Sequence, residues 1–385
     1  MSARVRAALA GAALGLLAPM AATGLASAGF IGQTGGAGFA IVTADQAKRT
    51  ETSFLDLPNN QYASSNLGKV SMARSSQGAY IVMFRGVLGP SGTGGVAHAR
   101  PTGLNTTAAA CYAAKPGSYL GTDARIDVSC FDAAGNRADT GFVVMWGRGG
   151  TQEGALVSAR FQPYTDPSTG QLVRDAGTSS LGSPPFGIRE GIGKYKVWVQ
   201  RETAIPFNRE GLQISSAAFG SCAVTKTFSP DGIYLQVSVS CAGFNGYGPI
   251  DTPFDISYSS GASIIGMLNL ASDAHVIVPK LTTNTAPIVP PVQRARIYGS
   301  TGGVISVARN GLGSYWVRLG QQAEGTGDGA TVVTAYGSDA RCWEAGSWIA
   351  HEPGSTFDRM VLVQCRNTAG GAVDTAFYLQ HTTRQ

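Results

Sequence analysis

A set of sequence motifs recurs three times along the 385 residues, and this repetition constrains the fold more than any other feature. Each copy has an Arg-x3-Gly-x-Tyr-x-Val motif, then two cysteines, then an Asp-Thr-x-Phe motif. The first motif begins at Arg74, Arg189 and Arg309, so the copies follow one another at intervals of 115 and 120 residues. Solenoid and propeller repeats are only about 20–50 residues long. The long period therefore predicts that each copy is a small domain in its own right.

The three repeats fill the chain after a leader of 28 residues. We place them at residues 29–150, 151–261 and 262–385. Each opens with a glycine-led apolar run that predicts a strand, namely Gly38–Val42, Gly154–Val157 and Gly266–Leu270. The equivalent motif residues in the three repeats are Arg74, Tyr80 and Asp139; Arg189, Tyr195 and Asp251; and Arg309, Tyr315 and Asp374.

Apolar and polar residues alternate with a period of two, which is the pattern of half-buried strands. One such run has Ile126, Val128 and Cys130 on one face and Asp127 and Ser129 on the other. Turn sequences separate the runs, and no helical period longer than two turns follows the leader. The chain is therefore predicted to be all-β, with three tandem β-sandwich-like repeats, or partly closed barrels, of six or seven strands each.

The six cysteines fall into three pairs, one in each repeat. Six cysteines allow 15 disulfide connectivities, but the repetition favours pairing within each repeat. The predicted disulfides are Cys111–Cys130, Cys222–Cys241 and Cys342–Cys365. The second cysteine of each pair shares the apolar phase of its strand, so its sulfur is expected in the core. Each bridge closes a loop of about 20 residues and is expected to contribute about 3 kcal/mol.

The first 28 residues read as a secretory signal peptide. Arg4 and Arg6 precede an apolar run, and the Ala-Ser-Ala sequence ending at Ala28 provides the small residues that a signal peptidase needs. The run contains Pro19 and many glycines, and it is shorter than the ~20 strongly apolar residues of a membrane span. We therefore predict cleavage after Ala28, a secreted mature protein with no membrane span, and conditions under which disulfides persist.

Charge excludes several classes of partner. Only 14% of the residues are charged, against about a quarter in an average globular protein. Removing the leader takes away two arginines and lowers the formal net charge from +5 to +3. Basic residues are scattered in runs of at most two, so the chain lacks the electrostatic pattern of a nucleic-acid-binding protein.

The order of motifs resembles a known bacterial repeat. The residues that carry the resemblance are Ala44-Asp45-Gln46, Gly68, Arg74, Gly78, Tyr80, Val82, Phe84, Cys111, Val128–Phe131, Gly135-Asn136, Asp139 and Phe142. They are similar to an uncharacterised repeat of about 110 residues that occurs in tandem in secreted proteins of actinobacteria and other environmental bacteria. Trp348 matches the family's aromatic residue between the cysteines, with Phe228 in the second repeat and only Tyr119 in the first. The resemblance implies secretion and a tandem β architecture, and no particular activity.

The repeated Arg and Asp residues have two interpretations. They are either three binding sites for anionic or sugar ligands, or structural residues that cap strand ends or pair with each other. We favour the structural interpretation, because residues kept in all three repeats are those that every copy of the fold needs.

No catalytic constellation, metal site or cofactor is predicted. The four histidines, His98, His275, His351 and His381, do not recur at equivalent positions and lack a hydrolase motif around them. Glu344, Glu352 and Asp358 lie near tryptophans and weakly suggest a glycosidase pair. Residues 132–136 and 325–329 resemble calcium loops only faintly and are interpreted as turns. A hydrolase is therefore the least favoured function.

Tryptophans are the best candidates for contacting a ligand. Trp316, Trp343 and Trp348 lie in the third repeat, and because Trp343 and Trp348 differ in strand phase, at least one is expected to be exposed. An exposed indole can stack on a sugar ring. We therefore predict a secreted, non-enzymatic protein with a binding or structural role and with a polysaccharide or cell-wall polymer as the leading ligand. The alternative is a protein-binding module such as a protease inhibitor.

Overall fold

Strands make up nearly all of the regular structure. In β9 (Asp123–Asp132), Ile126, Val128 and Cys130 are buried and Asp127 is exposed, which confirms the alternation read from the sequence. The computed structural model describes residues 36–384 except for 67, 89–94, 104–107, 149–154, 204–209, 230, 261–270, 284–286, 288–296, 300–302, 321–328 and 351–357. The predicted signal peptide and the strand predicted at 266–270 lie outside the described residues.

The first repeat contains two antiparallel sheets, of strand order β3-β1-β10-β6 and β2-β4-β5-β9-β7, with β8 paired to β9. A single turn of helix, α1 (Ala44–Ala47), follows the first strand and is capped by Thr43. The other strands are β1 (Ala37–Val42), β2 (Leu55–Asp56), β3 (Tyr62–Ser64), β4 (Val70–Ser76), β5 (Ala79–Phe84), β6 (Val96–Pro101), β7 (Ala108–Ala113), β8 (Gly117–Tyr119) and β10 (Phe142–Gly147).

The second repeat has the same plan, with sheets of order β12-β11-β18-β15 and β13-β14-β17-β16. Its opening strand, β11, pairs along its length with its closing strand, β18, as β1 pairs with β10 in the first repeat. The strands are β11 (Ala155–Thr165), β12 (Leu172–Ser179), β13 (Phe186–Gly191), β14 (Lys194–Gln200), β15 (Glu210–Ser216), β16 (Ser221–Phe228), β17 (Tyr234–Ala242) and β18 (Phe254–Ser260).

The third repeat follows the same plan again, with strand orders β20-β19-β26-β23 and β21-β22-β25-β24. A single parallel bridge between Val224 and Tyr336 connects β16 of the second repeat to β23 of the third. The strands are β19 (Ala271–Val278), β20 (Ile297–Gly299), β21 (Ile305–Gly311), β22 (Ser314–Leu319), β23 (Gly329–Tyr336), β24 (Arg341–Ala350), β25 (Asp358–Arg366) and β26 (Ala376–Arg384).

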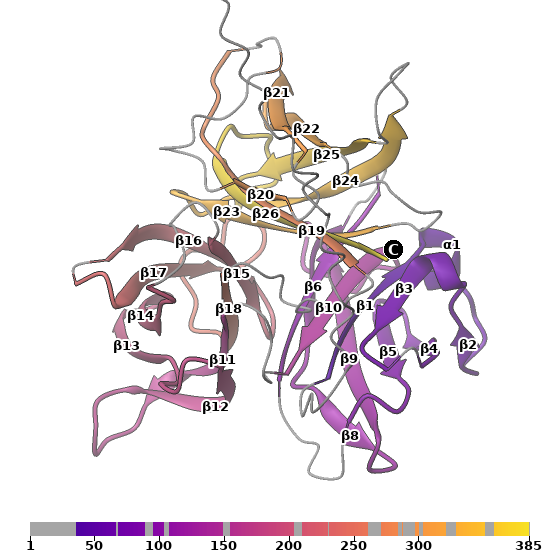
Figure 1. Cartoon of the computed structure of the whole chain (residues 1–385), viewed down its shortest axis with the longest axis horizontal. Coiled ribbons are helices and arrows are strands. Elements are labelled where there is room, and N and C mark those ends of the chain that lie inside the picture. Colours follow the sequence, from indigo (N-terminus) through magenta and orange to yellow (C-terminus); the bar gives the residue numbers. More distant parts are fainter. Residues whose placement is uncertain are drawn as a thin grey trace, which may run out of the picture. The chain divides into compact units, whose positions relative to one another are not determined.

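Each repeat is thus a two-sheet sandwich, and its strands are labelled in Figure 1. We call the sheet with the opening and closing strands the inner sheet, and the sheet with the two cysteines the outer sheet. The described residues contain more strands per repeat than the six or seven predicted. In the first and third repeats the excess comes from strands of two or three residues, such as β2 and β8, which are too short to show an alternating pattern. The second repeat has eight strands of at least six residues each.

The three disulfides confirm the predicted pairing. Each joins cysteines that lie directly opposite each other on neighbouring strands of an outer sheet, with Cα atoms 4.0–4.1 Å apart. The bridges are Cys111–Cys130, Cys222–Cys241 and Cys342–Cys365. All six residues are buried, as the strand phase predicts.

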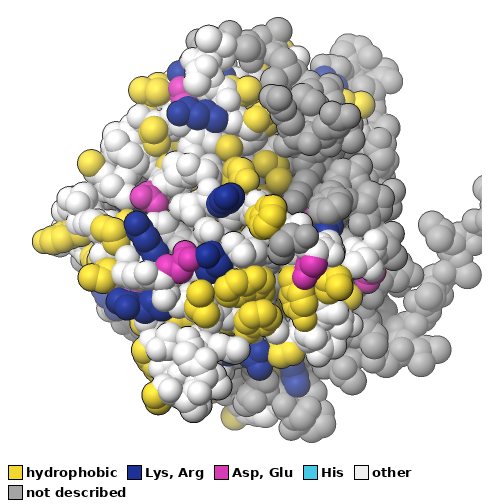
Figure 2. Space-filling view, turned by 90° about the vertical axis from the view of Figure 1, so that its left-hand side faces the viewer, with side chains coloured by type: hydrophobic (Ala, Val, Ile, Leu, Met, Phe, Trp, Pro, Cys, Tyr) yellow, Lys and Arg dark blue, Asp and Glu magenta, His cyan; other side chains and the backbone are white. Residues whose placement is uncertain are grey.

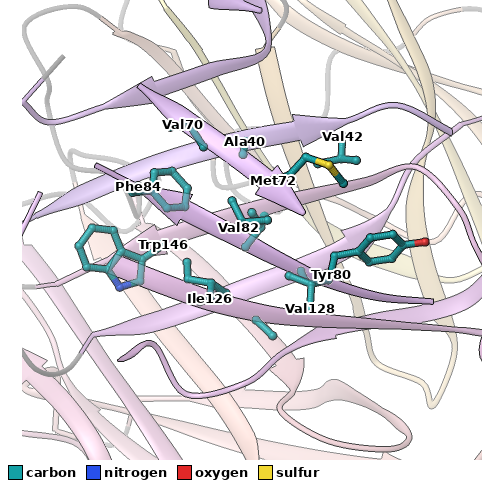
Figure 3. Packing of buried hydrophobic residues seen from close by; sticks show 14 of the residues in the cluster. Ala40, Val42, Val70, Met72, Tyr80, Val82, Phe84, Ile126, Val128 and Trp146 are labelled. Carbon is teal, nitrogen blue, oxygen red and sulfur yellow. The ribbon is translucent and has the colours of Figure 1, made fainter. Parts of the chain in front are cut away.

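The core of the first repeat lies between its two sheets. Figure 3 shows side chains from both sheets gathered there, among them Phe84, Val82 and Trp146. Tyr80 from the outer sheet meets Phe142 from the inner sheet with ring centroids 4.9 Å apart. The second and third repeats have equivalent clusters. Burial of these faces supplies the main driving force for folding.

The repeats are packed together, an arrangement that the sequence analysis left open. Residues 32–385 form one compact unit. Tyr378 of the third repeat belongs to the core of the second, and Ala223 of the second belongs to the core of the third. A further cluster joins the inner sheets of repeats one and three through Phe39, Met145, Val332 and their neighbours. A repeat period in a sequence carries no information about such contacts, because they depend on surfaces that face other copies.

Hydrogen bonds of polar side chains also connect the repeats. The buried His98 of β6 bonds through Nδ1 to Ser215 Oγ (2.7 Å) and through Nε2 to Ser257 Oγ (2.8 Å) of the second repeat. Arg160 Nη2 donates to the carbonyl of Ala113 at 3.0 Å. Hydroxyl-rich strands such as β15 and β18 therefore face another repeat rather than solvent.

Candidate binding surfaces

The repeated Arg and Asp residues pair with each other in all three repeats. In the first, Arg74 Nε and Nη2 donate to Asp139 Oδ1 (3.1 Å) and Oδ2 (2.8 Å). Asp139 Oδ1 also accepts from the backbone N–H of Gly78 and the hydroxyl of Tyr80, each at 2.8 Å. We call this arrangement the clasp. The other clasps consist of Arg189, Gly193, Tyr195 and Asp251, and of Arg309, Gly313, Tyr315 and Asp374.

The clasp explains the glycine of the motif. Gly78 has a φ of +62°, which L-residues with a side chain rarely adopt. A Cβ at this position would also lie 2.6 Å from the carbonyl oxygen of Cys130. The clasp therefore anchors the tight turn between β4 and β5 to the segment that leads into the closing strand of the repeat.

Burial and the hydrogen bonds of the clasp change the pKa of its carboxylate and of its tyrosine. Burial alone would raise the pKa of Asp139, but the hydrogen bonds from Arg74, Gly78 and Tyr80 outweigh it and hold that pKa below its ordinary value. Burial, followed by the hydrogen bond to Asp139, raises the pKa of Tyr80. A carboxylate offers about four acceptor positions, and the carboxylate of each clasp accepts four hydrogen bonds. These residues are therefore arranged to hold the fold together rather than to bind a ligand.

Asp374→Asn tests this role in the most buried clasp, where Asp374 and Arg309 side chains are 10% and 12% exposed. We expect a loss of about 2 kcal/mol in the free energy of unfolding, since charge-assisted hydrogen bonds are lost and the new amide nitrogen faces Arg309. Urea unfolding followed by circular dichroism measures the loss. Asp127→Asn is the control, because Asp127 pairs with Arg125 at the surface and should lose under about 0.5 kcal/mol. Equal losses in the two variants would contradict the structural role.

The three candidate tryptophans differ in exposure: Trp348 is exposed, Trp316 is half-buried and Trp343 is buried. Trp316 of β22 and Trp348 of β24 meet edge to face with ring centroids 4.6 Å apart. The Trp348 residue is 42% exposed, and Trp343 is only 3% exposed. The phase difference in the sequence thus correctly predicts one exposed indole. Trp343 is not placed to stack on an external ligand, because it is covered and its ring lies against Arg366.

A second aromatic surface, which the sequence analysis missed, lies on the outer sheet of the second repeat. Phe186, Trp198, Gln236 and Phe228 are directly opposite one another across β13, β14, β17 and β16. Phe186 and Trp198 stack with ring centroids 5.2 Å apart and planes 8° from parallel. Phe228 is 53% exposed. We call these four residues the aromatic row. Figure 2 looks onto this side of the molecule and shows hydrophobic side chains gathered among charged ones.

The same row of positions differs among the repeats. In the third repeat it contains Ser306, Arg318, Met360 and Trp348, and Trp316 lies beside it. In the first repeat the row is Ser71, Met83, Arg125 and Gly117 and carries no aromatic residue. Unlike the clasp, this surface varies, as expected of positions that the fold itself does not need. A sequence signal for it exists, since Trp198 is out of phase with the buried Tyr195, Val197 and Val199.

The other residues considered from the sequence do not come together in one site. His98 and His381 are buried, and burial lowers the pKa of His98 to about 3. Asp358 pairs with Arg318 and Glu344 is buried. Asp132 accepts a hydrogen bond from the backbone of Asn136, which confirms a turn there. The positions 325–328 and 351–352 lie outside the described residues.

Within the part of the chain that the structure describes, no group of three or more His, Cys, Asp or Glu residues has the arrangement of a metal site. No helix among the described residues is long and apolar enough to cross a membrane. Comparison of the chain with models of protein families, with curated proteins and with solved structures gave no match.

Proposed function

We propose that the protein is secreted, acts outside the cell without catalysing a reaction, and binds a polysaccharide or cell-wall polymer. The observation that carries this proposal is the aromatic row of the second repeat, together with the contact between the half-buried Trp316 and the exposed Trp348 of the third. Three disulfides add support for an extracellular location, because such bridges persist in oxidising compartments.

An aromatic row on a flat sheet suits a sugar chain for two reasons. Neighbouring strands lie about 4.8 Å apart, so four strands hold the row along about 14 Å, enough for a short run of sugar rings. The apolar face of a sugar ring can pack on an aromatic face and avoid water. Gln236 within the row offers an amide that both donates and accepts hydrogen bonds.

Two such surfaces in one chain favour a polymeric ligand. Each surface is small, so binding at either one alone is expected to be weak. A long polymer can occupy both, and the second contact then forms at a high effective concentration. This argument supports a polymer over a free monosaccharide. It also supports a glycan over the alternative, a protein-binding module, since an inhibitor is expected to present a protruding loop rather than a flat row.

Depletion assays with insoluble cell-wall material, chitin and cellulose test the proposal. We expect the pairs Trp198→Ala with Phe228→Ala, and Trp316→Ala with Trp348→Ala, each to weaken binding at least tenfold, and the quadruple variant to abolish it. Stacking of a nucleobase on an aromatic side chain contributes about 1–3 kcal/mol, and we expect a loss of similar size for each sugar ring that loses its aromatic partner.

Tyr164→Ala is the matched control. Tyr164 is 58% exposed on β11, in the inner sheet of the same repeat. Its loss removes an exposed aromatic ring without touching the row and should leave binding unchanged. The proposal fails if the intact protein is not retained by any of these polymers, or if the quadruple variant is retained as well as the intact protein.

A further inference from the structure

A small cavity lies where the three repeats meet. Its volume is about 20 Å³, larger than the roughly 10–15 Å³ that one ordered water needs. The first repeat contributes Arg100, Pro101 and Ala110 to its wall, the second contributes Ser221 and Cys222, and the third contributes Val333, Ala335 and Ala340–Trp343. Two of these residues are arginines and none is acidic.

Arg100 enters the cavity wall from β6 and is tied to both other repeats. Its Nε donates to the carbonyl of Val333 at 3.0 Å, and its Nη2 donates to the carbonyl of Ile214. Neither partner carries a charge. Burial lowers the pKa of Arg100 to about 10, and among the described residues no carboxylate opposes this shift. Arg100 is half-buried, and its guanidinium brings a positive charge to the wall of the cavity.

Arg341 brings a second positive charge to the same cavity. Its Nη2 donates to the carbonyl of Thr368 at 2.7 Å, and its guanidinium lies over the Phe244 ring at 5.2 Å from the centroid. Its Nη1 is buried and has no hydrogen-bond partner among the described residues. Burial lowers the pKa of Arg341 too. The residue is 94% buried, so bulk water does not satisfy this donor.

Trp343 contributes a further unpaired donor. Its Nε1 is buried and has no partner within the described part of the chain. An unsatisfied buried donor is destabilising, and more so if it is charged. Arg341 and Trp343, the residues that carry these two donors, line the cavity together with Arg100 and Ser221. Two cationic side chains, an indole and a serine on one cavity wall match the requirements of an anion. They do not match a cation, which needs oxygen acceptors.

We propose that this junction cavity binds a small inorganic anion, either a halide or a tetrahedral oxyanion, between Arg341, Trp343 and Arg100. The anion accepts hydrogen bonds from Arg341 Nη1 and Trp343 Nε1 and offsets the charge of both arginines. Since the wall comes from all three repeats, the anion stabilises their assembly. The cavity is far smaller than the ~300 Å³ of an organic-ligand site, so this site is independent of the proposed polymer-binding surfaces.

Thermal unfolding in sodium bromide, sodium sulfate or sodium gluconate at constant ionic strength tests the proposal. Gluconate is the comparison anion because it is too large for the cavity. We expect the midpoint to rise with the concentration of bromide or sulfate, as it does when a ligand binds only the folded state, and to stay constant in gluconate. Crystals soaked in sodium bromide should show anomalous density beside Arg341 and Trp343.

Two variants separate binding at this site from a general salt effect. Trp343→Phe removes the indole donor while keeping a ring, and it should weaken the apparent affinity for bromide or sulfate at least tenfold. Arg341→Gln should abolish the response. Arg49→Gln is the control, because it removes one positive charge from an exposed pair with Glu51 and should respond like the unmodified protein. Equal midpoints in all three salts, or an unchanged response in both cavity variants, would overturn the proposal, as would density for water alone.

Discussion

Asp255→Ala should reduce the free energy of unfolding by about 3–5 kcal/mol, the usual cost of removing one partner from a buried ion pair. Asp255 accepts from Arg160 Nε at 2.7 Å and from Nη2 at 2.5 Å, and both side chains are almost completely buried. The substitution leaves the Arg160 guanidinium in the interior with only the carbonyl of Ala113 as a described partner. Because that carbonyl belongs to the first repeat, the loss should loosen the contact between the first two repeats.

Urea unfolding at pH 7, followed by tryptophan fluorescence, measures the effect. Asp56→Ala is the matched control, since Asp56 pairs with Lys69 at the surface and should lose less than about 1 kcal/mol. The double variant Arg160→Met with Asp255→Leu should regain much of the stability, because it removes both charges together. A loss below about 1 kcal/mol for Asp255→Ala would show that the pair is not buried in solution.

Mild acid should destabilise the protein strongly, well above the pH at which its carboxylates titrate. Burial, followed by the charges of Arg100 and Arg160, lowers the pKa of His98 to about 3, and burial lowers that of His381 as well. An unfolded histidine has a pKa of about 6.5. The unfolded chain therefore binds more protons below pH 6.5, and the free energy of unfolding falls as the pH is lowered from 6.5 towards 3. Each histidine contributes about 1.4 kcal/mol per pH unit, or about 4 kcal/mol for both at pH 5.

Unfolding in urea at a series of pH values between 7.5 and 4.5 checks this slope. His98→Gln, which cannot become charged, should show about half of the pH dependence of the unmodified protein. A second decline is expected below about pH 4, where the clasp aspartates take up protons in the unfolded chain before they do so in the folded protein. Their hydrogen bonds hold the pKa of Asp139, Asp251 and Asp374 below the ordinary value. A constant free energy of unfolding between pH 7.5 and 5 would contradict the buried, neutral state of His98.

Features local to one repeat could be predicted from the sequence. Period-two alternation located β9 and its buried Cys130, and repetition fixed the cysteine pairing, because both depend only on residues of a single sandwich. The repeated Arg and Asp residues pair with each other, which is one of the arrangements considered from the sequence. Their pairing could not be fixed in advance, since Arg74 and Asp139 are 65 residues apart and meet only once the strand order is known.

Features that join strands or repeats could not be predicted. The aromatic row depends on the register of four strands, which sets Phe186 opposite Trp198 and Phe228 opposite Gln236. Trp343 is on the outer sheet, yet it is covered, so its strand phase alone does not reveal its burial. His98 was considered only as a catalytic candidate, and its two serine partners come from another repeat.

The packing of Tyr378 limits the order in which the repeats can complete their folding. Tyr378 lies in β26, the last strand of the chain, and it packs into the core of the second repeat. Chains are synthesised from the N-terminus, and early segments can begin to fold first. The second repeat nevertheless cannot complete its core until β26 has been synthesised. A chain without β26 would therefore lose part of the cores of two repeats, the second as well as the third.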